Sequence, residues 1–368
     1  MQGGAGEVAE RIIAENKRII ADFIAEHIRG ADNAPKAAVS RKSFQDNSYY
    51  EGGLAEAKRS GKGIYYYKNG DVYLGDWLND KFNGQGVYIF AKGERYEGQL
   101  RDGQKNGFGT YRYFNGNVYE GDWVGDVKQG RGRYTYFATG ESYSGDWVRG
   151  VKEGSGVFTL ATGDVFEGQF RNGLKEGQGK VDYVDGASFE GRWVADKANG
   201  EGRLRLANGD SFRGSYVDSK RNGPGVYTFA AGGSLEGEFR QDLCHGDCTI
   251  SYANGDVFRG EAREGAREGQ GVQNYANGDR YQGEFRQDAK DGFGVYFYAQ
   301  TGDTYEGDWK RNLKHGHGLY RYANGDVFEG NFVEGQRVGE GKVVLKSGEE
   351  VLFEFGPGGA RANVTVAP

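Results

Sequence analysis

The chain has 368 residues, and its 53 acidic and 47 basic side chains give a formal charge of −6, which argues against nucleic acid as a partner because phosphates require clustered Lys and Arg. Hydrophobic residues make up only 37% and include 25 Tyr, 22 Phe and 5 Trp, which excludes a deep aliphatic core and favours a thin aromatic one. Because there is no run of eighteen apolar residues, no signal-peptide pattern and only two cysteines, we expect a soluble, cytoplasmic protein without disulfides.

Residues 1–30 are predicted to form an N-terminal amphipathic helix, which ends near Gly30. Its apolar stripe contains Ile12, Ile19, Ile20, Phe23 and Ile24. A lone helix of this length is marginally stable in water, so the stripe must be buried against the chain's own sheet, a second copy or a partner. We expect a partner or a second copy, because the polar linker at 31–47 is long enough to let the helix stand away from the rest of the chain.

Residues 48–356 form an array of thirteen repeats, most of them 23 residues long. The repeats begin at anchor positions Tyr50, Tyr73, Tyr96, Tyr119, Tyr143, Phe166, Phe189, Phe212, Leu235, Phe258, Tyr281, Tyr305 and Phe328. A Gly stands two residues after every anchor and another eleven residues after it; a third follows two places later in every repeat but one, where Cys248 replaces it. A fixed period of this kind indicates a repeat array in which each unit packs only on its neighbours.

Each repeat has the alternation of two β-strands. In residues 119–123 (Tyr-Glu-Gly-Asp-Trp), the two rings and the Gly face one side and the two carboxylates the other. A second strand, as in 107–113, places Gly107, Gly109, Tyr111 and Tyr113 on one face, and Asn115-Gly116 then makes a hairpin turn. We therefore predict an all-β fold, an elongated, twisted single antiparallel sheet with one aromatic and one charged face, followed by a loose tail at 357–368.

The repeat resembles the MORN repeat (membrane occupation and recognition nexus), with a near-complete copy in Tyr305-Glu306-Gly307-Asp308-Trp309, Gly316-His317-Gly318, Tyr320-Arg321-Tyr322 and Asn324-Gly325-Asp326. The resemblance covers about 300 residues of the chain. It implies β-hairpins stacked into a twisted sheet with a groove. Many family members carry a second domain, such as a lipid kinase, a methyltransferase or a membrane anchor. We expect none here, and chains made of these repeats alone resemble components of ciliary axonemes and of membrane-associated cytoskeletons in protists.

Residues that could support catalysis or bind a metal are few. The four histidines are His27, His245, His315 and His317, and none has the setting of a general base. The segment Cys244-His245-Gly246-Asp247-Cys248 offers soft ligands, but zinc sites normally pair two such segments. We therefore predict a structural role for this segment, or at most a site shared between two chains, and we predict no metal, no cofactor and no enzymatic activity.

The aromatic face is the strongest candidate for a binding site, because a single sheet has no second layer to cover all of its rings. The rings could also be only the thin core of the array, and we favour the binding groove. The predicted groove comprises Tyr65, Tyr67, Tyr88, Tyr111, Tyr113, Tyr134, Tyr136, Trp77, Trp123 and Trp147.

Two functional hypotheses follow. The first is a non-enzymatic scaffold of a cytoskeletal assembly, either a cilium or flagellum axoneme or a membrane-associated cytoskeleton. It would bind cytoskeletal proteins through the groove and the N-terminal helix, with self-association as a further option. The second is a peripheral phospholipid-binding module that tethers membrane to cytoskeleton. The helix carries five acids and four bases, which is poor for an anionic membrane, so the scaffold is favoured.

Overall fold

The computed structural model describes residues 3–29, 39–356 and 361–366. These residues contain one α-helix, α1 (Gly3–Phe23), which continues into a π-helical turn, η1 (Ile24–Ile28), and 29 strands. The chain groups into two units, residues 1–185 with 193–196, and residues 186–192 with 197–368. The predicted all-β fold of antiparallel hairpins with a single N-terminal helix is confirmed.

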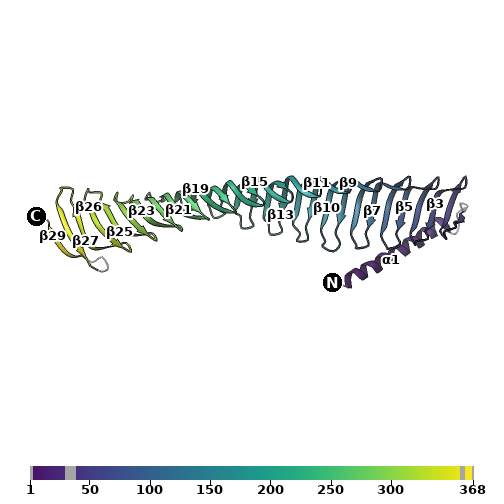
Figure 1. Ribbon diagram of the computed structural model, residues 1–368, viewed down its shortest axis with the longest axis horizontal. Coiled ribbons are helices and arrows are strands. Elements are labelled where there is room, and N and C mark those ends of the chain that lie inside the picture. The colour runs from purple at the N-terminus through teal and green to yellow at the C-terminus, as the bar shows by residue number, and fades with distance from the viewer. Residues whose placement is uncertain (1–2, 30–38, 357–360, 367–368) are drawn as a thin grey trace. The chain divides into compact units, whose positions relative to one another are not determined.

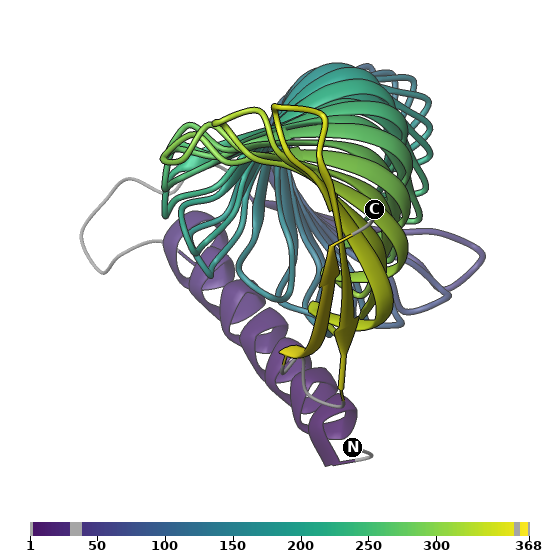
Figure 2. The same cartoon turned by 90° about the vertical axis from the view of Figure 1, so that its left-hand side faces the viewer.

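In the first unit the strands follow one another as an antiparallel meander. They are β1 (Ser40–Ser43), β2 (Tyr49–Ala55), β3 (Lys58–Tyr66), β4 (Val72–Leu78), β5 (Lys81–Ile89), β6 (Arg95–Arg101), β7 (Gln104–Arg112), β8 (Val118–Val124), β9 (Val127–Thr135), β10 (Ser142–Val148), β11 (Val151–Thr159), β12 (Val165–Arg171) and β13 (Leu174–Asp182). Strand β14 (Ser188–Val194) has residues in both units. The strands are visibly bent rather than flat (Figure 2).

The second unit repeats the same meander. Its strands are β15 (Lys197–Arg205), β16 (Ser211–Val217), β17 (Lys220–Thr228), β18 (Gly233–Arg240), β19 (Leu243–Tyr252), β20 (Val257–Arg263), β21 (Ala266–Asn274), β22 (Arg280–Arg286), β23 (Ala289–Phe297), β24 (Thr304–Lys310), β25 (Leu313–Arg321), β26 (Val327–Val333), β27 (Gln336–Val344), β28 (Glu350–Phe355) and β29 (Arg361–Val366). Neighbours from β15 to β29 pair antiparallel.

Glycines face each other across the hairpins because an anchor ring lies over them, except in the β18–β19 hairpin, where Gly237 faces Cys248 and the anchor is Leu235. In the β4–β5 hairpin, Tyr73 pairs with Tyr88 and Gly75 with Gly86. A Cβ on Gly86 would lie 2.6 Å from a ring carbon of Tyr73, closer than any real contact. The Tyr73 hydroxyl reaches across both glycines and donates a hydrogen bond of 2.8 Å to the Asp76 carbonyl. The ring therefore lies against bare backbone, which only glycine provides at these two positions.

A bulge interrupts the alternation within each repeat. In the β4–β5 hairpin the register shifts between Gly75 and Trp77. The equivalent shift in the β6–β7 hairpin corrects one prediction: Gly107, with φ +96°, would point a Cβ at the Gln99 side chain, whereas Gly109 would point one at Tyr96. The two glycines therefore do not share a face, because the backbone turns over between them.

Helix α1 packs against the face of the sheet opposite the anchor rings. Ile64, Val72, Leu74 and Ile89 form a buried cluster, and the partly buried hydrophobic residues packed on it are Ile19, Ile20, Phe23, Ile24, Ile28, Tyr66 and Val87. Figure 1 shows α1 beside the strands of the first repeats. The expectation of a helix that stands away is therefore wrong: in these repeats the opposite face carries apolar residues where later repeats carry charges.

Polar contacts from the middle of α1 fix the helix on the same repeats. The Asn16 amide donates to the Gly93 carbonyl at 3.0 Å. The buried Arg95 guanidinium donates to the side chains of Asn16 and Glu15, both at 2.9 Å. The hydrogen bond from Arg95 lowers the pKa of Glu15. The helix is thus held along its middle and its C-terminal part by the sheet that follows it.

Candidate binding surface: the tyrosine ladder and the lysine column

The three tryptophans predicted to line the groove lie in the core. Trp77, Trp123 and Trp147 are only 3–4% exposed. The Trp147 indole packs edge-on against the anchor rings of two successive repeats, Tyr119 at 5.3 Å and Tyr143 at 5.4 Å between centroids. Its N–H donates to the Gly132 carbonyl at 3.0 Å. These indoles therefore stabilise the stacking of repeats and are not available to a partner, which corrects the prediction.

The tyrosines of the second strands form a continuous row in the first unit. We call this row the tyrosine ladder: Tyr65, Tyr67, Tyr88, Phe90, Tyr111, Tyr113, Tyr134, Tyr136 and Phe158, with centroid separations of 4.5–6.3 Å between successive rings. Tyr65 is 9% exposed and the others are half-buried. The predicted tyrosines are thus brought together, and Phe90 and Phe158 join them. The second unit has a shorter row: Tyr275, Tyr296, Tyr298, Tyr320 and Tyr322.

Acids in the hairpin turns hold one side of the ladder. The Tyr88 hydroxyl donates to Asp71 at 2.8 Å, and the Tyr111 hydroxyl donates to Glu94 at 3.0 Å. The other oxygen of Asp71 accepts the backbone N–H of Ala91 in the next turn at 2.8 Å. Burial and the hydrogen bond to Glu94 raise the pKa of Tyr111 well above its usual value. These turn acids are therefore occupied in positioning rings and turns.

A column of basic residues, which sequence reasoning missed, faces the same rings. Nine residues after the anchor, ten of the thirteen repeats carry a Lys or Arg: Arg59, Lys105, Lys128, Lys152, Lys175, Arg221, Arg267, Lys290, Lys314 and Arg337. The Lys128 Nζ lies 4.5 Å from the ring centroid of Tyr134 and 4.9 Å from that of Tyr119. The aliphatic part of a lysine covers apolar surface while its ammonium stays near water. This lysine column therefore covers the anchor rings and adds cation–π contacts.

Four members of the column form an ion pair with an acid from the next repeat. Arg59 contacts Asp80 at 2.9 Å, and Lys105 contacts Asp126 at 3.7 Å. The second unit has the same pairs at Arg221–Asp242 (3.4 Å) and Arg267–Asp288 (3.2 Å). Each of these acids stands seven residues after its anchor. The sequence therefore shows both members of each pair: the base stands nine residues after one anchor, and the acid stands seven residues after the next anchor.

Four lysines of the column have no such acid. They are Lys128, Lys152, Lys290 and Lys314. At the position where other repeats carry Asp80 or Asp126, the repeat that follows each of them carries, in the same order, Gly150, Gly173, Asn312 and Gly335. The next repeat therefore supplies no acid to these ammonium groups. Within the described residues, no carboxylate makes an ion pair with any of the four lysines. Burial, and next the neighbouring Lys105, lower the pKa of Lys128 to about 8. Burial likewise lowers the pKa of Lys290 and of Lys314 to about 8.

The cysteine pair of the second unit replaces the usual contacts of its repeat. Cys244 stands in the lysine column and Cys248 in a glycine position, and both are buried free thiols. Burial and the hydrogen bond between the two thiols raise the pKa of Cys248. Among the described residues, no cluster of three or more His, Cys, Asp or Glu side chains could hold a metal ion. No helix among them is long and apolar enough to cross a bilayer.

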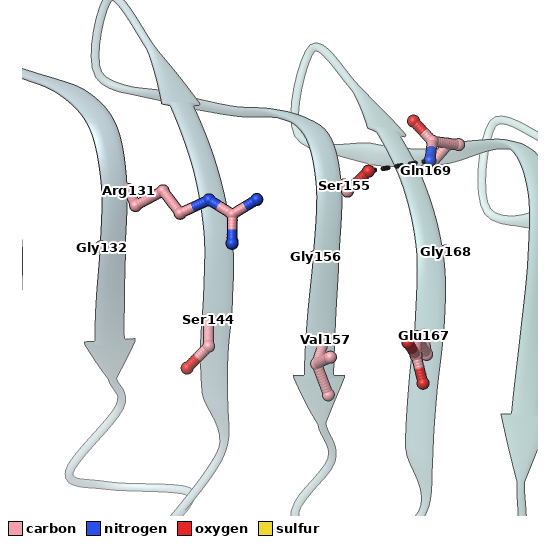
Figure 3. A pocket seen from close by; sticks show the side chains of 10 residues that line it. Arg131, Gly132, Ser144, Ser155, Gly156, Val157, Glu167, Gly168 and Gln169 are labelled. Atoms are coloured by element: carbon pink, nitrogen blue, oxygen red, sulfur yellow. Dashed lines mark hydrogen bonds between the residues drawn. The ribbon is translucent and has the colours of Figure 1, made fainter.

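The opposite face of the first unit has an open hollow of about 470 Å³. Figure 3 shows its lining, where the Gln169 amide donates to Ser155 at 3.0 Å and Arg131 extends across the neighbouring strand that carries Ser144. Small side chains and bare glycine backbone make this depression, since Ser144 and Ser155 stand where other repeats carry larger residues. The lining contains no histidine or cysteine, and it shows no arrangement of a nucleophile with a base.

The family model for the MORN repeat matches residues 50–72, 73–95, 96–118, 119–137, 143–165, 166–188, 189–211, 212–234, 236–257, 258–280, 281–301, 305–327 and 328–350. A comparison with curated proteins finds no match.

Among solved structures, the chain is similar to the TCP10 domain of CPAP from Danio rerio, with 14% identity, a TM-score of 0.20, and coverage of 76% of this chain and 99% of that one. The same domain in complex with a peptide of Danio rerio STIL matches with 10% identity and a TM-score of 0.23, over 90% and 100% of the two chains. A virginiamycin B lyase from Staphylococcus aureus matches with 10% identity and a TM-score of 0.13, over 85% and 97%. At these scores the likenesses carry no argument about function.

Proposed function

Since the chain belongs to the MORN repeat family, we propose that it is a non-enzymatic scaffold that binds partner proteins along the tyrosine ladder. The repeats themselves are compatible with a scaffold or a membrane-binding module. We place the scaffold in a cytoskeletal assembly, a cilium or flagellum axoneme or a membrane-associated cytoskeleton, on the strength of the family resemblance alone.

The observation that carries the proposal is the ladder of half-buried rings in the first unit. Tyr113 and Tyr136 are each in ring contact with two neighbours, yet remain partly open to solvent. Aromatic residues are enriched in protein–protein interfaces, where they supply most of the binding energy at a low entropic cost. Rings that are already fixed by their neighbours lose little further freedom when a partner covers them.

The lipid-binding alternative has one observation in its favour, the unpaired lysines of the column. Their ammonium groups are half-buried among rings, however, whereas membrane-binding bases usually extend from an exposed surface. The helix α1, the other element that could lie on a membrane, is packed on the sheet. Protein binding is therefore the better-supported function.

The test compares partner sets under conditions that preserve the cytoskeleton. The full chain, a Tyr113→Ser/Tyr136→Ser variant and a Phe114→Ser control are each purified from cells, and bound proteins are identified by mass spectrometry. Phe114 is a matched control because it is a 48% exposed ring that lies outside the ladder. We expect partners to be lost from the double variant and retained by the control. An identical set in all three, or binding of phosphatidylserine vesicles that is lost in the double variant, would reject the proposal.

A further inference from the structure

The unpaired lysines of the column occur in two pairs, each on neighbouring repeats. Lys128 and Lys152 form one pair in the first unit, and Lys290 and Lys314 form the other in the second unit. Elsewhere in the described part of the column, each charged position is followed by an acid in the next repeat, as Arg221 is, except for Arg337, whose guanidinium donates to the Tyr322 hydroxyl. Each unit therefore presents one place where two half-buried cations lie side by side among aromatic rings.

The repeats without the acid differ from the others in the side chain at this position, whereas their backbone conformation is the same. The Gly150 N–H bonds to the Lys128 carbonyl at 2.9 Å, just as the Asp126 N–H bonds to the Lys105 carbonyl at 3.1 Å. Both residues have a left-handed conformation, with φ +82° for Gly150 and +67° for Asp126. An aspartate would fit at Gly150, where the only side-chain atom near a new Cβ is a methyl of Val127 at 3.9 Å. Only the carboxylate is missing.

The rings around each pair favour an occupant that is both anionic and apolar. Lys152 lies 4.7 Å from the Phe158 centroid, and Lys314 lies 4.6 Å from that of Tyr320. A desolvated ammonium gains more from a carboxylate than a fully hydrated one does, because the surrounding dielectric is low. The ladder beside it offers flat aromatic surface, which favours proline rings and other rigid apolar groups.

The spacing of the pair selects a backbone conformation for that occupant. Two strands per repeat place equivalent residues of neighbouring repeats roughly 9.6 Å apart. A polyproline II helix has three residues per turn and a rise of about 3.1 Å, so every third side chain recurs on one face after about 9.3 Å. A β-strand repeats its face after roughly 6.7 Å, which does not match.

We propose that each lysine pair binds an acidic, proline-rich segment of a partner protein in the polyproline II conformation, with an Asp or Glu at every third residue. The inference rests on the proposed function and names the class of partner that the ladder receives. The carboxylates replace the acid that Asp80 or Asp126 supplies in other repeats, and the prolines between them lie on the ladder. An anionic membrane is less well matched, because turn acids such as Glu94 and Glu141 stand along the edge of the same surface.

The experiment measures fluorescence anisotropy of a labelled peptide of Pro-Pro-Glu triplets with the full chain. A Lys290→Met/Lys314→Met background leaves only the first site, and methionine retains the apolar stem over the rings. In this background we introduce Gly150→Asp/Gly173→Asp, which adds a carboxylate at the repeat position that Asp126 occupies after Lys105. We expect a loss of at least about tenfold in affinity, as for other close charge pairs. Asp126→Gly, which frees Lys105, should instead strengthen binding, and Lys92→Gln in an exposed turn should change nothing.

Two further peptides test charge and spacing. A Pro-Pro-Gln peptide, and a shuffled peptide with the same composition and contiguous glutamates, should both bind at least about tenfold more weakly than the Pro-Pro-Glu peptide. Equal binding of the glutamine peptide, equal binding of the shuffled peptide, unchanged affinity in Gly150→Asp/Gly173→Asp, or no binding of any peptide would each overturn the inference. So would lysine-dependent binding of phosphatidylserine vesicles in preference to the peptide.

Two controls keep the result interpretable. The melting temperature of Gly150→Asp/Gly173→Asp should equal that of its background, since Asp80, Asp126 and Asp196 occupy the same repeat position and also have a positive φ. The proposed function is judged separately by the Tyr113→Ser/Tyr136→Ser purification. Partners lost in that variant but retained by Lys128→Met/Lys152→Met/Lys290→Met/Lys314→Met, which removes both pairs, would uphold the scaffold and reject the acidic segment.

Discussion

At the scale of single residues, the fold depends on the absence of a side chain as much as on the rings. Gly121 has an ordinary extended backbone, so its role is to leave room and not to adopt a left-handed conformation. A Cβ there would lie 2.6 Å from the Arg131 carbonyl oxygen and 2.7 Å from the Tyr119 hydroxyl. The ring and the facing strand cannot both keep their places if that space is filled.

We therefore expect Gly121→Val to destabilise the protein by about 1–3 kcal/mol, the usual cost of overpacking a close-packed site. Equilibrium urea denaturation followed by tyrosine and tryptophan fluorescence measures the change. Gly103→Asn is the control, because nothing lies within 4 Å of a Cβ at Gly103 and asparagine tolerates its φ of +88°. A valine variant as stable as the asparagine control would show that the ring does not need the space.

The buried lysines predict an unusual dependence of stability on pH. Lys128, Lys290 and Lys314 have a pKa of about 8 in the folded protein, lowered mainly by burial. The pKa of an unfolded lysine is about 10.4, so between these values the unfolded chain binds more protons and stability rises with pH. Above roughly pH 10 the trend reverses, because unfolded tyrosines ionise while buried ones such as Tyr119, whose pKa burial raises, do not.

The measurement is the free energy of unfolding from urea titrations at several pH values between roughly 7 and 10. The Lys128→Met/Lys290→Met/Lys314→Met variant should lack most of the rise seen in the unmodified chain. A flat profile in the unmodified chain over this window would mean that the three ammonium groups are hydrated as in the unfolded state. Binding of an acidic peptide should weaken over the same window, since the lysines lose their charge.

At the scale of elements, α1 acts as a second layer for the first repeats. The face opposite the rings is exposed and polar in most of the array, but Ile64 and Leu74 are at most 1% exposed because η1 and the end of α1 cover them. This arrangement removes the apolar stripe of the helix and an apolar patch of the sheet from water at the same time. Neither surface would be stable alone.

Deletion of residues 1–29 should therefore lower the melting temperature and cause aggregation, because Ile64, Val72, Leu74 and Ile89 become exposed. Thermal melts and size-exclusion chromatography with light scattering measure the two effects. Ile13→Ser is the matched control within the helix, since Ile13 is 44% exposed and should be tolerated. A truncated chain that stays monomeric with an unchanged melting temperature would show that the helix contributes little to the sheet.

At the scale of the whole molecule, stability is a sum of local terms between successive repeats. In the second unit, Trp309 contacts the anchor ring of its own repeat, Tyr305, and that of the preceding repeat, Tyr281. The following repeat adds a contact between Tyr305 and Phe332. Arrays of this kind behave as one-dimensional systems with nearest-neighbour coupling.

Gly307→Val is expected to show this coupling directly. A Cβ at Gly307 would lie 2.6 Å from the His317 carbonyl oxygen and 2.7 Å from the Tyr305 hydroxyl, so this repeat must open first. Hydrogen exchange read by mass spectrometry should show lost protection in residues 305–327 and in the repeat on either side, with the first unit unchanged. A uniform loss of protection across the chain would contradict local coupling.

The sequence by itself determined the hairpin repeat, the antiparallel order of the strands and the side of the sheet on which the anchor rings lie. The glycine positions recur at a fixed period, and a ring such as Tyr73 can lie flat only where Gly75 and Gly86 have no side chain. These constraints are local to one hairpin, so they can be read without knowing what any other part of the chain does. The tyrosines of the ladder follow from the same alternation.

Only the tertiary structure decided which rings are covered and what surrounds them. Trp123 is buried because rings of the preceding repeat, Tyr96 and Tyr111, pack on it. Lys128 faces the rings because the register places it opposite Trp123. The sequence allowed the helix to bury its apolar stripe against the chain's own sheet, a second copy or a partner. In the structure the stripe packs on the apolar cluster around Ile64. Such outcomes depend on contacts between segments far apart in the chain, which a local pattern does not determine.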